Sequence, residues 1–339
     1  MTRGAGSGAR QLLRYVLRRL AAAVPILLAI SFGVFWAANQ IAKPGIDLAL
    51  NPRITPAART AYLDSLGLND PLVVRYLRWL ADFVSGDLGV SLVRNGAEVW
   101  PIVRTALANT LLLVVIAIAA SLALGITVGT LSAVRSGSLI DDTVTTLSFV
   151  GISIPVFWLG LMLQLFFGLW LANWLGVTPP LLPTAGLYSP GQQGFDLVDR
   201  LRHLALPAMA LSLQLVAVYS RYMRASLLDV LSSDHVRVAR GKGMRERTVI
   251  IRHGVRNALI PVTTQAAIDM GQLVGGLIVT EQVFEYPGMG RLFLKSLFDG
   301  DYTMLLATTM LVAAAVFLMN LAADLFYGVL DPRIRRGTR

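Results

Sequence analysis

The side chains that most often carry out catalysis or bind metals are scarce in this sequence, and their spacing suits neither task. There are no cysteines, which excludes disulfides, thiolate metal sites and cysteine nucleophiles. The three histidines, His203, His235 and His253, do not have the spacing of a zinc motif such as HExxH. Gly241 and Lys242 lack the glycine five residues earlier that a phosphate-binding loop requires. We therefore predict no catalytic site, no metal site and no cofactor on this chain.

Asp269 is the one charged residue in a long apolar stretch, and Gln265 and Gln272 lie near it on one face of a predicted helix. A carboxylate at the middle of a bilayer costs about 2.5 to 3.5 kcal/mol, so it normally faces protein or water. We expect these three side chains to line a polar translocation path, the alternative being a buried hydrogen bond to another helix. Gln164 and Gln214 are further candidates, with the same alternative.

The elements that position these groups are predicted to be membrane helices. Of the 339 residues, 55% are hydrophobic and only 15% are charged, and the mean hydropathy is +0.62. A soluble domain must cover itself with polar groups, so this composition indicates a polytopic, all-α membrane protein. A helix needs roughly 20 apolar residues to cross the bilayer. Six stretches qualify, with approximate bounds 20–42, 104–134, 143–172, 204–222, 258–282 and 303–328.

The basic residues predict the orientation of these spans. Of the 30 Lys and Arg residues, 19 lie on the side that holds both termini, 1–19 and 329–339. Nine of these 19 lie from Arg221 to Arg256, eight of them in the connection 223–257. Since cytoplasmic loops carry the excess of Lys and Arg, both termini are predicted to be cytoplasmic. The net charge of +10 is thereby assigned to these loops and not to nucleic-acid binding. The remaining connections, 43–103, 173–203 and 283–302, would be external.

Glycines and prolines inside the predicted spans indicate how the helices pack. Gly125 and Gly129 form a GxxxG pair in the second span, and Gly271 and Gly275 form another in the fifth. We expect such pairs to mark close helix packing. Pro155 and three other prolines also lie inside spans, where neighbouring helices or polar groups can recover the freed backbone carbonyls.

The cytoplasmic connection 223–257 is unusually long and basic for a loop. Its sequence predicts a short helix that Ser233 or Asp234 caps at the start and that Gly241 or Gly243 ends.

On that helix, Val236 and Ala239 would share one face, with Arg237 and Arg240 on the other. A second helix would begin at Thr248 and lead into the fifth span. A short helix outside the bilayer, with a small apolar face and basic flanks, has the form of a docking element. The alternative is a solvated basic loop that only sets topology.

The connection resembles the EAA loop of permease subunits of binding-protein-dependent ABC importers, in the form of the dipeptide, oligopeptide and nickel family. Members typically carry a run like YVRTARAKGL…RHALRNALIP, and this chain has HVRVARGKGM…RHGVRNALIP. The general pattern expects Glu-Ala-Ala followed, after three residues, by Gly. Arg237, Val238 and Ala239 replace that triplet, while Ala239 and Gly243 keep the spacing, as is usual in the peptide branch.

Further stretches in the same order resemble the B-type permease subunit of that family, so the resemblance covers most of the chain after about Gln11. They are LGLNDPLVVRYLRWLADFVSGDLGVSL (66–92), SIPVFWLG (153–160), HLALPAMAL (203–211), RASLLDVL (224–231), TEQVFEYPGMGRLF (280–293) and NLAADLFYGVLDPRIR (320–335).

This resemblance implies a type I importer permease fold with a permease core at 105–330, in the bacterial inner membrane. A second, C-type permease would share the path, two ATPase subunits would hold ATP and magnesium, and an external binding protein would deliver a di- or oligopeptide. Asp269 would then meet a peptide amino terminus. Segment 234–247 would couple this chain to an ATPase subunit, through Asp234, Val236, Arg237, Ala239, Arg240, Gly241, Gly243 and Met244.

Two other classes of function remain open at this point. The chain could be an ion-coupled carrier acting alone, with Asp269 as its ion site, or a membrane enzyme using Asp269 or His203. Neither has a need for a basic docking loop. Within the ABC class, nickel chelates and glutathione-like solutes share the permease pattern with peptides.

Overall fold

A computed structural model describes residues 5–41, 55, 57, 60, 69–91, 93–178, 180–192 and 194–330. Part of the predicted external segment 43–103 and nearly all of the predicted tail 329–339 lie outside these residues. The chain divides into two units, which are described separately. Unit 1 comprises 1–109 and 288–317, and unit 2 comprises 110–287 and 318–339.

Unit 1 is built on the C-terminal end of the first predicted span. Phe35 packs edge-on against Tyr76 and Tyr302, at ring-centroid distances of 5.6 and 5.8 Å, and Ser31 and Tyr76 share a 2.7 Å hydrogen bond between their hydroxyls. The elements of unit 1 are α1 (Ala5–Ile41), α4 (Leu72–Ser85), the antiparallel strands β1 (Val90–Ser91) and β2 (Ala97–Glu98), the start of α5 (Val99–Val134), α14 (Met289–Phe298) and the first part of α15 (Tyr302–Leu330).

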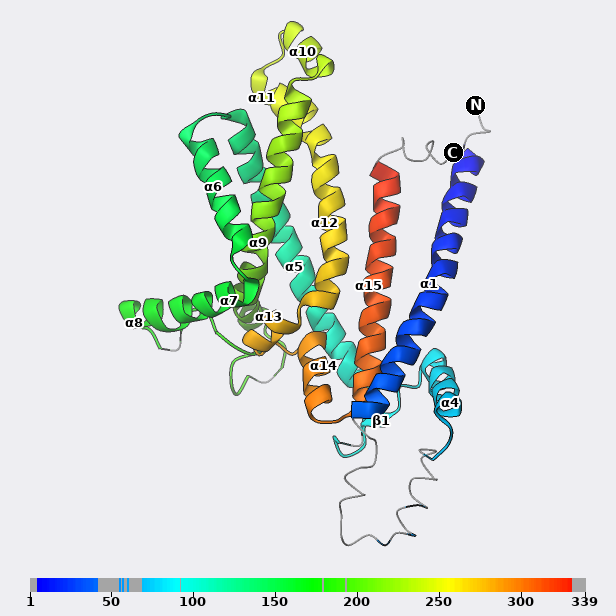
Figure 1. The fold of residues 1–339 in the computed structure, drawn as a ribbon. Helices are drawn as coiled ribbons and strands as arrows, with labels where there is room; N and C mark the ends of the chain where they lie inside the picture. Colours follow the sequence, from blue (N-terminus) through cyan, green and yellow to red (C-terminus); the bar gives the residue numbers. More distant parts are fainter. Residues whose placement is uncertain are drawn as a thin grey trace. The chain divides into compact units, whose positions relative to one another are not determined.

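Unit 2 holds the predicted functional residues. Helix α9 (Leu197–Leu231) is its centre and packs against α6 (Leu139–Ser153), α7 (Val156–Leu165) and α12 (Arg256–Gly276). Figure 1 shows α10 (Asp234–Gly241) and α11 (Glu246–Thr248) beyond the ends of α9 and α12. The other elements are the π-helical turns η1 (Phe166–Trp170) and η2 (Val249–Val255), the helices α8 (Leu171–Leu175) and α13 (Ile278–Val283), and the remainders of α5 and α15.

Five of the described helices are long and apolar enough to cross a membrane. They span Val16–Gln40, Val99–Val134, Val156–Leu175, Leu197–Leu231 and Tyr302–Leu325. The predicted span 258–282 is also helical, as α12 and α13, but it does not reach this level of hydropathy, because Asp269, Gln265 and Gln272 interrupt its apolar sequence. The predicted fifth span is therefore the helix that carries three of the five predicted path residues.

The predicted third span, 143–172, is not one continuous helix. Helix α6 ends at Ser153, Ile154 is extended (φ −83°, ψ 125°), and α7 begins after Pro155. Proline cannot donate the helical hydrogen bond, and its ring forces the preceding residue out of the helical region. Figure 1 shows α7 and α8 leaving sideways from the direction of α6 and α9. The expectation that neighbours would keep Pro155 inside a single helix is wrong.

The glycine pair in α5 lies against α9, as the sequence predicts. A Cβ atom on Gly125 would lie 2.7 Å from the Tyr219 Cβ, and one on Gly129 would lie 2.5 Å from the carbonyl oxygen of Ser220. Real Cβ atoms do not approach so closely, so only glycine permits this spacing of the two helices. In α12, Gly271 faces the Asn320 side chain of α15 in the same way.

A buried ion pair joins the α5–α6 connection to α9. The guanidinium of Arg224 donates two hydrogen bonds to the Asp141 carboxylate, at 2.6 and 2.7 Å. Ser132 Oγ and the Gly137 amide donate to the same carboxylate, at 2.5 and 3.0 Å. Arg224, followed by Ser132 and Gly137, therefore holds the pKa of the Asp141 carboxyl well below its usual range. The pair fixes α9 shortly before it leads into α10.

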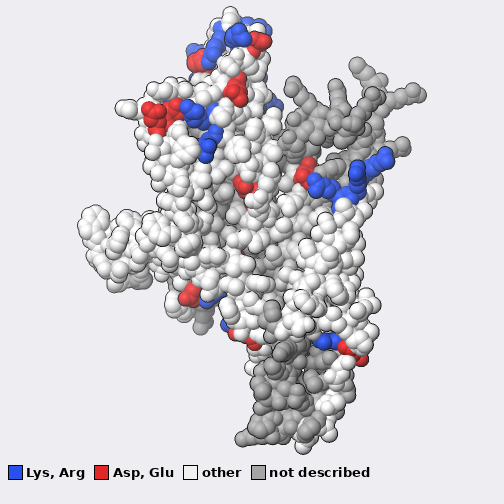
Figure 2. All heavy atoms as spheres, viewed as in Figure 1, with Lys and Arg blue, Asp and Glu red and all other residues white. Residues whose placement is uncertain are grey.

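Charged side chains gather at one end of unit 2. Figure 2 shows Lys, Arg, Asp and Glu concentrated over α10, α11 and the α5–α6 connection, whereas the visible surface over the middle of these helices is largely uncharged. Helix α9 has 35 residues, about 52 Å at 1.5 Å per residue, which exceeds the roughly 30 Å of a hydrocarbon core. It is long enough to hold α10 outside the bilayer.

Candidate functional site

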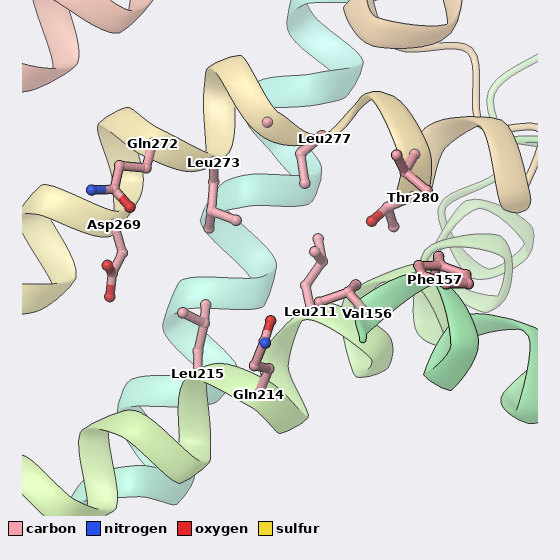
Figure 3. A pocket seen from close by; sticks show the side chains of 12 residues that line it. Val156, Phe157, Leu211, Gln214, Leu215, Asp269, Gln272, Leu273, Leu277 and Thr280 are labelled. Carbon is pink, nitrogen blue, oxygen red and sulfur yellow. The ribbon is translucent and has the colours of Figure 1, made fainter. Parts of the chain in front are cut away.

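A cavity of about 440 Å³ lies between α9 and α12 in unit 2 (Figure 3). Asp269 and Gln272 face it from α12, and Gln214 faces it from α9. Most of the remaining lining is apolar, and Thr280 adds a hydroxyl group. The lining residues are Val156, Phe157, Leu211, Gln214, Leu215, Asp269, Gln272, Leu273, Gly276, Leu277, Val279 and Thr280. Three of the five predicted path residues thus meet at one cavity.

Asp269 is buried, with 8% of its surface exposed, and its two carboxylate oxygens differ. Gln265 Nε2 donates to Oδ1 at 2.9 Å, while Oδ2 has no hydrogen-bond partner. The hydroxyl of Tyr219, from α9, lies close to the carboxylate but makes no hydrogen bond. Gln265 therefore orients Asp269 and does not itself line the cavity. One oxygen of the Asp269 carboxylate, Oδ2, is therefore still free to accept hydrogen bonds.

Gln164 does not belong to the cavity. Its Nε2 donates to the backbone carbonyls of Thr184 and Val283, at 2.8 and 2.9 Å. The side chain connects α7 to the end of α13 and to the loop before α9. Gln164 therefore makes hydrogen bonds within the protein and does not line the path. Sequence alone did not separate Gln164 from Gln214, because both are single glutamines in apolar helices.

Helix α10 confirms the predicted short helix in the connection 223–257. Val236 and Ala239 are buried and pack in a cluster with Val249 of η2, against which Val230, Leu231 and Met244 also pack. As predicted, they share one face, and Arg237 and Arg240 are exposed. Arg240 does not point away from the chain, however, because its guanidinium binds Glu246 and the Leu231 carbonyl. The apolar face is therefore used to attach α10 to its own chain. Val236 and Ala239 do not lie on the outer surface.

The end of α10 is a Schellman motif built on Gly243. The Met244 amide donates to the Ala239 carbonyl, and the Gly243 amide donates to the Arg240 carbonyl at 2.9 Å. Gly243 has φ +74°, a left-handed conformation that glycine adopts without steric cost. Of the two glycines that the sequence offered, Gly243 makes the turn, and Gly241 is the last helical residue.

Two polar contacts connect α10 to the helices that follow it. Arg240 binds Glu246 at the start of α11 through two hydrogen bonds, at 2.7 and 3.2 Å. Its guanidinium lowers the pKa of the Glu246 carboxyl, so the pair is ionised at neutral pH. His235 Nε2 lies 3.3 Å from Nδ2 of Asn257 at the start of α12. Helix α10 is therefore fixed to the beginning of α12 as well as to the end of α9.

The predicted second helix of the connection begins two residues earlier than expected. Arg245 is extended (φ −58°, ψ 133°), and α11 starts at Glu246 instead of Thr248. The chain then continues through η2 into α12 without leaving helical geometry. Gly254 lies in η2 against Leu227 of α9, where a Cβ atom would lie 2.9 Å from Leu227 Cδ1.

The outward surface of α10 contains one apolar side chain that is not among the coupling residues predicted from the sequence. Val238 is 57% exposed, between exposed Asp234, Arg237 and Lys242. Arg237 and Asp234 form an ion pair with each other at 2.6 Å. Helical spacing places Val238 on the side of the helix opposite Val236. The sequence-based prediction rested on Val236 and Ala239, which lie on the inner face, and so did not include Val238. We refer to Asp234, Arg237, Val238 and Lys242 as the α10 outer face.

Comparisons with known proteins agree with this architecture. The model of the family described as "Binding-protein-dependent transport system inner membrane component" matches residues 125–336, and the model of its N-terminal part matches residues 12–97. The "Oligopeptide transport system permease protein AppB" of Bacillus subtilis (strain 168) is 40% identical over 320 residues, covering 94% of this chain and 98% of the relative.

A second relative and one solved structure extend the comparison. The "Dipeptide transport system permease protein DppB" of Escherichia coli (strain K12) is 34% identical over 346 residues, covering 96% of this chain and 99% of the relative. A chain of the inward-facing MetNI methionine ABC transporter superposes with a TM-score of 0.52 at 18% identity, covering 68% of this chain and 96% of that chain; at this identity the likeness shows the fold alone. This multi-pass membrane protein therefore belongs to the family of binding-protein-dependent transport system inner membrane components, as a permease subunit with the type I ABC importer fold.

Proposed function

We propose that this chain imports di- or oligopeptides as one of two permease subunits of an ATP-driven transporter. A C-type permease completes the path, and an external binding protein delivers the substrate. The peptide class is supported by the two relatives, an oligopeptide and a dipeptide transport permease, of which this chain covers 98% and 99%. The transporter lies in the bacterial inner membrane with both termini of this chain in the cytoplasm, which the distribution of Lys and Arg supports.

ATP and magnesium are bound by two partner ATPase subunits, and α10 is the element of this chain that contacts one of them. The observation that carries this assignment is the α10 outer face. It presents Val238 among charged groups, at the charged end of unit 2, on a helix whose other face is fully used for attachment. A small apolar centre with a polar rim is the usual composition of a protein interface.

The contacts of α10 supply a route for mechanical coupling. A displacement of α10 acts on α12 through the Arg240–Glu246 pair, the His235–Asn257 contact and the cluster around Val249. Helix α12 carries Asp269 to the cavity. Closure of the ATPase subunits would therefore reorient the helix that lines the path, which is what alternating access requires.

Substitution of Val238 tests the proposal without disturbing the fold, because the side chain is exposed. In the assembled transporter, we expect Val238→Asp to lower ATP-driven peptide uptake about tenfold, equivalent to ~1.4 kcal/mol of lost interface free energy. Val238→Leu is the matched control and should keep uptake. Insertion and assembly of both variants are checked by co-purification of the subunits.

Equal uptake in wild type and Val238→Asp would contradict the docking role of α10. Uptake by the wild-type chain without ATPase subunits would instead support an ion-coupled carrier. Import of nickel chelates or a glutathione-like solute, and not of peptides, would keep the permease role and reject the peptide class.

A further inference from the structure

We propose that the cavity between α9 and α12 contains a subsite for the amino-terminal ammonium group of a peptide, with the free Oδ2 of Asp269 as its acceptor. This inference rests on the proposed function and names the group that the path recognises. Asp269 is more than nine-tenths buried and lines the cavity, and its Oδ2 has no hydrogen-bond partner. A buried carboxylate oxygen without a partner is costly unless a ligand supplies the missing donor and charge.

The charge of the site selects a cation. No Lys, Arg or His belongs to the cavity lining, and Asp269 is its one ionisable residue. An ammonium group offers three donors and a positive charge, which match the free Oδ2 of Asp269. In the part of the chain that the structure describes, no group of three or more His, Cys, Asp or Glu residues could hold a metal ion. The ligand chemistry is therefore an organic ammonium.

The remaining lining fits the rest of a peptide. Gln214 and Gln272 face the cavity from opposite helices and offer amide donors and acceptors to a peptide bond. Leu211, Leu215 and Leu273 provide an apolar wall that accepts side chains of different size. A volume of about 440 Å³ lies in the range of 300–1,000 Å³ typical of small-molecule sites.

Gly276 keeps part of this space open. It is the last residue of α12 and lines the cavity, and a Cβ atom there would have no heavy atom within 4 Å. A larger side chain therefore fits at this position, at the edge of the cavity, without a clash at its Cβ atom. Gly276→Leu offers a second way to remove the subsite that leaves Asp269 in place.

The absence of cysteine from this chain permits a direct binding assay. Leu273→Cys places a single thiol in the cavity lining of this chain, and the rate of its reaction with maleimide reports occupancy. The assay uses the assembled transporter with its other subunits free of reactive cysteines, in lipid nanodiscs and without the binding protein, so that delivery does not contribute to selectivity. The probes are the dipeptide Ala-Ala and its N-acetyl derivative.

We expect Ala-Ala to slow labelling of Leu273→Cys and N-acetyl-Ala-Ala to do so roughly tenfold less effectively, equivalent to about 1.4 kcal/mol. Adding Asp269→Asn should weaken protection by Ala-Ala to the level of the acetylated probe, and Asp269→Glu should retain part of it. Gly276→Leu should abolish protection by both probes. Ser136→Cys, exposed in the turn between α5 and α6 and outside the cavity, is the control thiol and should react at the same rate with and without dipeptide.

Equal protection by the two probes, unchanged protection in Asp269→Asn, or no protection in the wild-type background would each overturn the subsite. So would protection by sodium ions in place of the dipeptide. ATP-driven uptake in the presence of the binding protein is measured on the same preparations. Peptide uptake together with any of these results would reject the subsite and leave the proposed function intact, whereas absence of peptide uptake would reject the proposed function itself.

Discussion

Gly243 shows how a single backbone conformation ends α10. Its φ of +74° lets the amides of Gly243 and Met244 return to the last turn of the helix. An L-residue with a side chain pays about 1–2 kcal/mol for this conformation. Gly241, two residues earlier, is helical and has open space around it, so the two glycines form a matched pair.

We expect Gly243→Ala to loosen the end of α10 by about 1–2 kcal/mol and to reduce coupling, because the chain between α10 and α11 no longer closes without strain. Gly241→Ala should leave α10 intact or stabilise it by about 0.5–1 kcal/mol. Amide hydrogen exchange over residues 234–248 in the purified transporter measures both effects. Faster exchange in Gly241→Ala than in Gly243→Ala would contradict the assignment of the turn to Gly243.

The Asp141–Arg224 pair has a defined pH dependence. The pKa of Asp141 is lowered from 3.8 in the folded protein, first by the hydrogen bonds from Arg224. Its contribution to stability is therefore fully present above about pH 4 and is lost only as the pH falls through the lower folded-state pKa.

Asp141→Asn should destabilise the protein by roughly 1–3 kcal/mol, because half-buried Arg224 loses its charged acceptor. The difference from wild type should be the same at pH 5 and pH 8. Thermal unfolding in detergent at both pH values measures this, with exposed Asp142→Asn as the control. A difference that disappears at pH 5 would show that the Asp141 carboxyl is protonated there and that the pair does not hold it ionised.

At the residue scale, sequence patterns identified the predicted site residues but not the residues that contact them. Helical spacing placed Val236 with Ala239 correctly, yet it did not say that this face packs on Val249, 13 residues later, and so leaves Val238 as the outward apolar residue. In the same way, the carbonyls that satisfy Gln164 come from Thr184 and Val283, distant positions that no local pattern connects.

At the element scale, the close approach of α5 to α9 depends on Gly129. Alanine there would place its Cβ 2.5 Å from the Ser220 carbonyl oxygen and 2.7 Å from Met223 Cβ. Backbone atoms cannot turn aside as a flexible side chain does, so the two helices must separate. Gly33, inside α1, has open space around it and is the matched control.

We expect Gly129→Ala to destabilise the protein by about 1–3 kcal/mol, the usual cost of overpacking, and Gly33→Ala to have little effect. The measurement is the thermal aggregation midpoint of the purified transporter. If both variants melt at the temperature of the wild type, the α5–α9 contact is not as tight as described.

The break in the predicted third span was present in the sequence but was interpreted incorrectly. Pro155 was treated as a tolerated kink because prolines are common in membrane helices. Pro207 and Pro261 do lie inside α9 and α12, so the residue type does not decide the outcome. Packing decides it, since α7 turns away after Ile154 to contact α9 and α13. That contact is formed by residues far apart in the chain.

At the scale of the whole molecule, the composition and the basic loops were sufficient to predict a multi-pass, all-α protein, and the order of the conserved-looking stretches was sufficient to predict the permease family. Helix α12 is the informative exception. Its hydropathy is lower than that of the five helices that are long and apolar enough to cross a membrane, because it carries Asp269, Gln265 and Gln272. Two of these three residues line the cavity.

The central claim is that the α10 outer face lies in the cytoplasm and contacts an ATPase subunit. A single thiol at Val238→Cys, in this otherwise cysteine-free chain, tests both parts with one membrane-impermeant maleimide. We predict labelling in inside-out vesicles stripped of the ATPase subunits, strong protection when those subunits are bound, and no labelling in intact spheroplasts. Labelling from outside in spheroplasts, or equal labelling with and without bound ATPase subunits, would contradict the account.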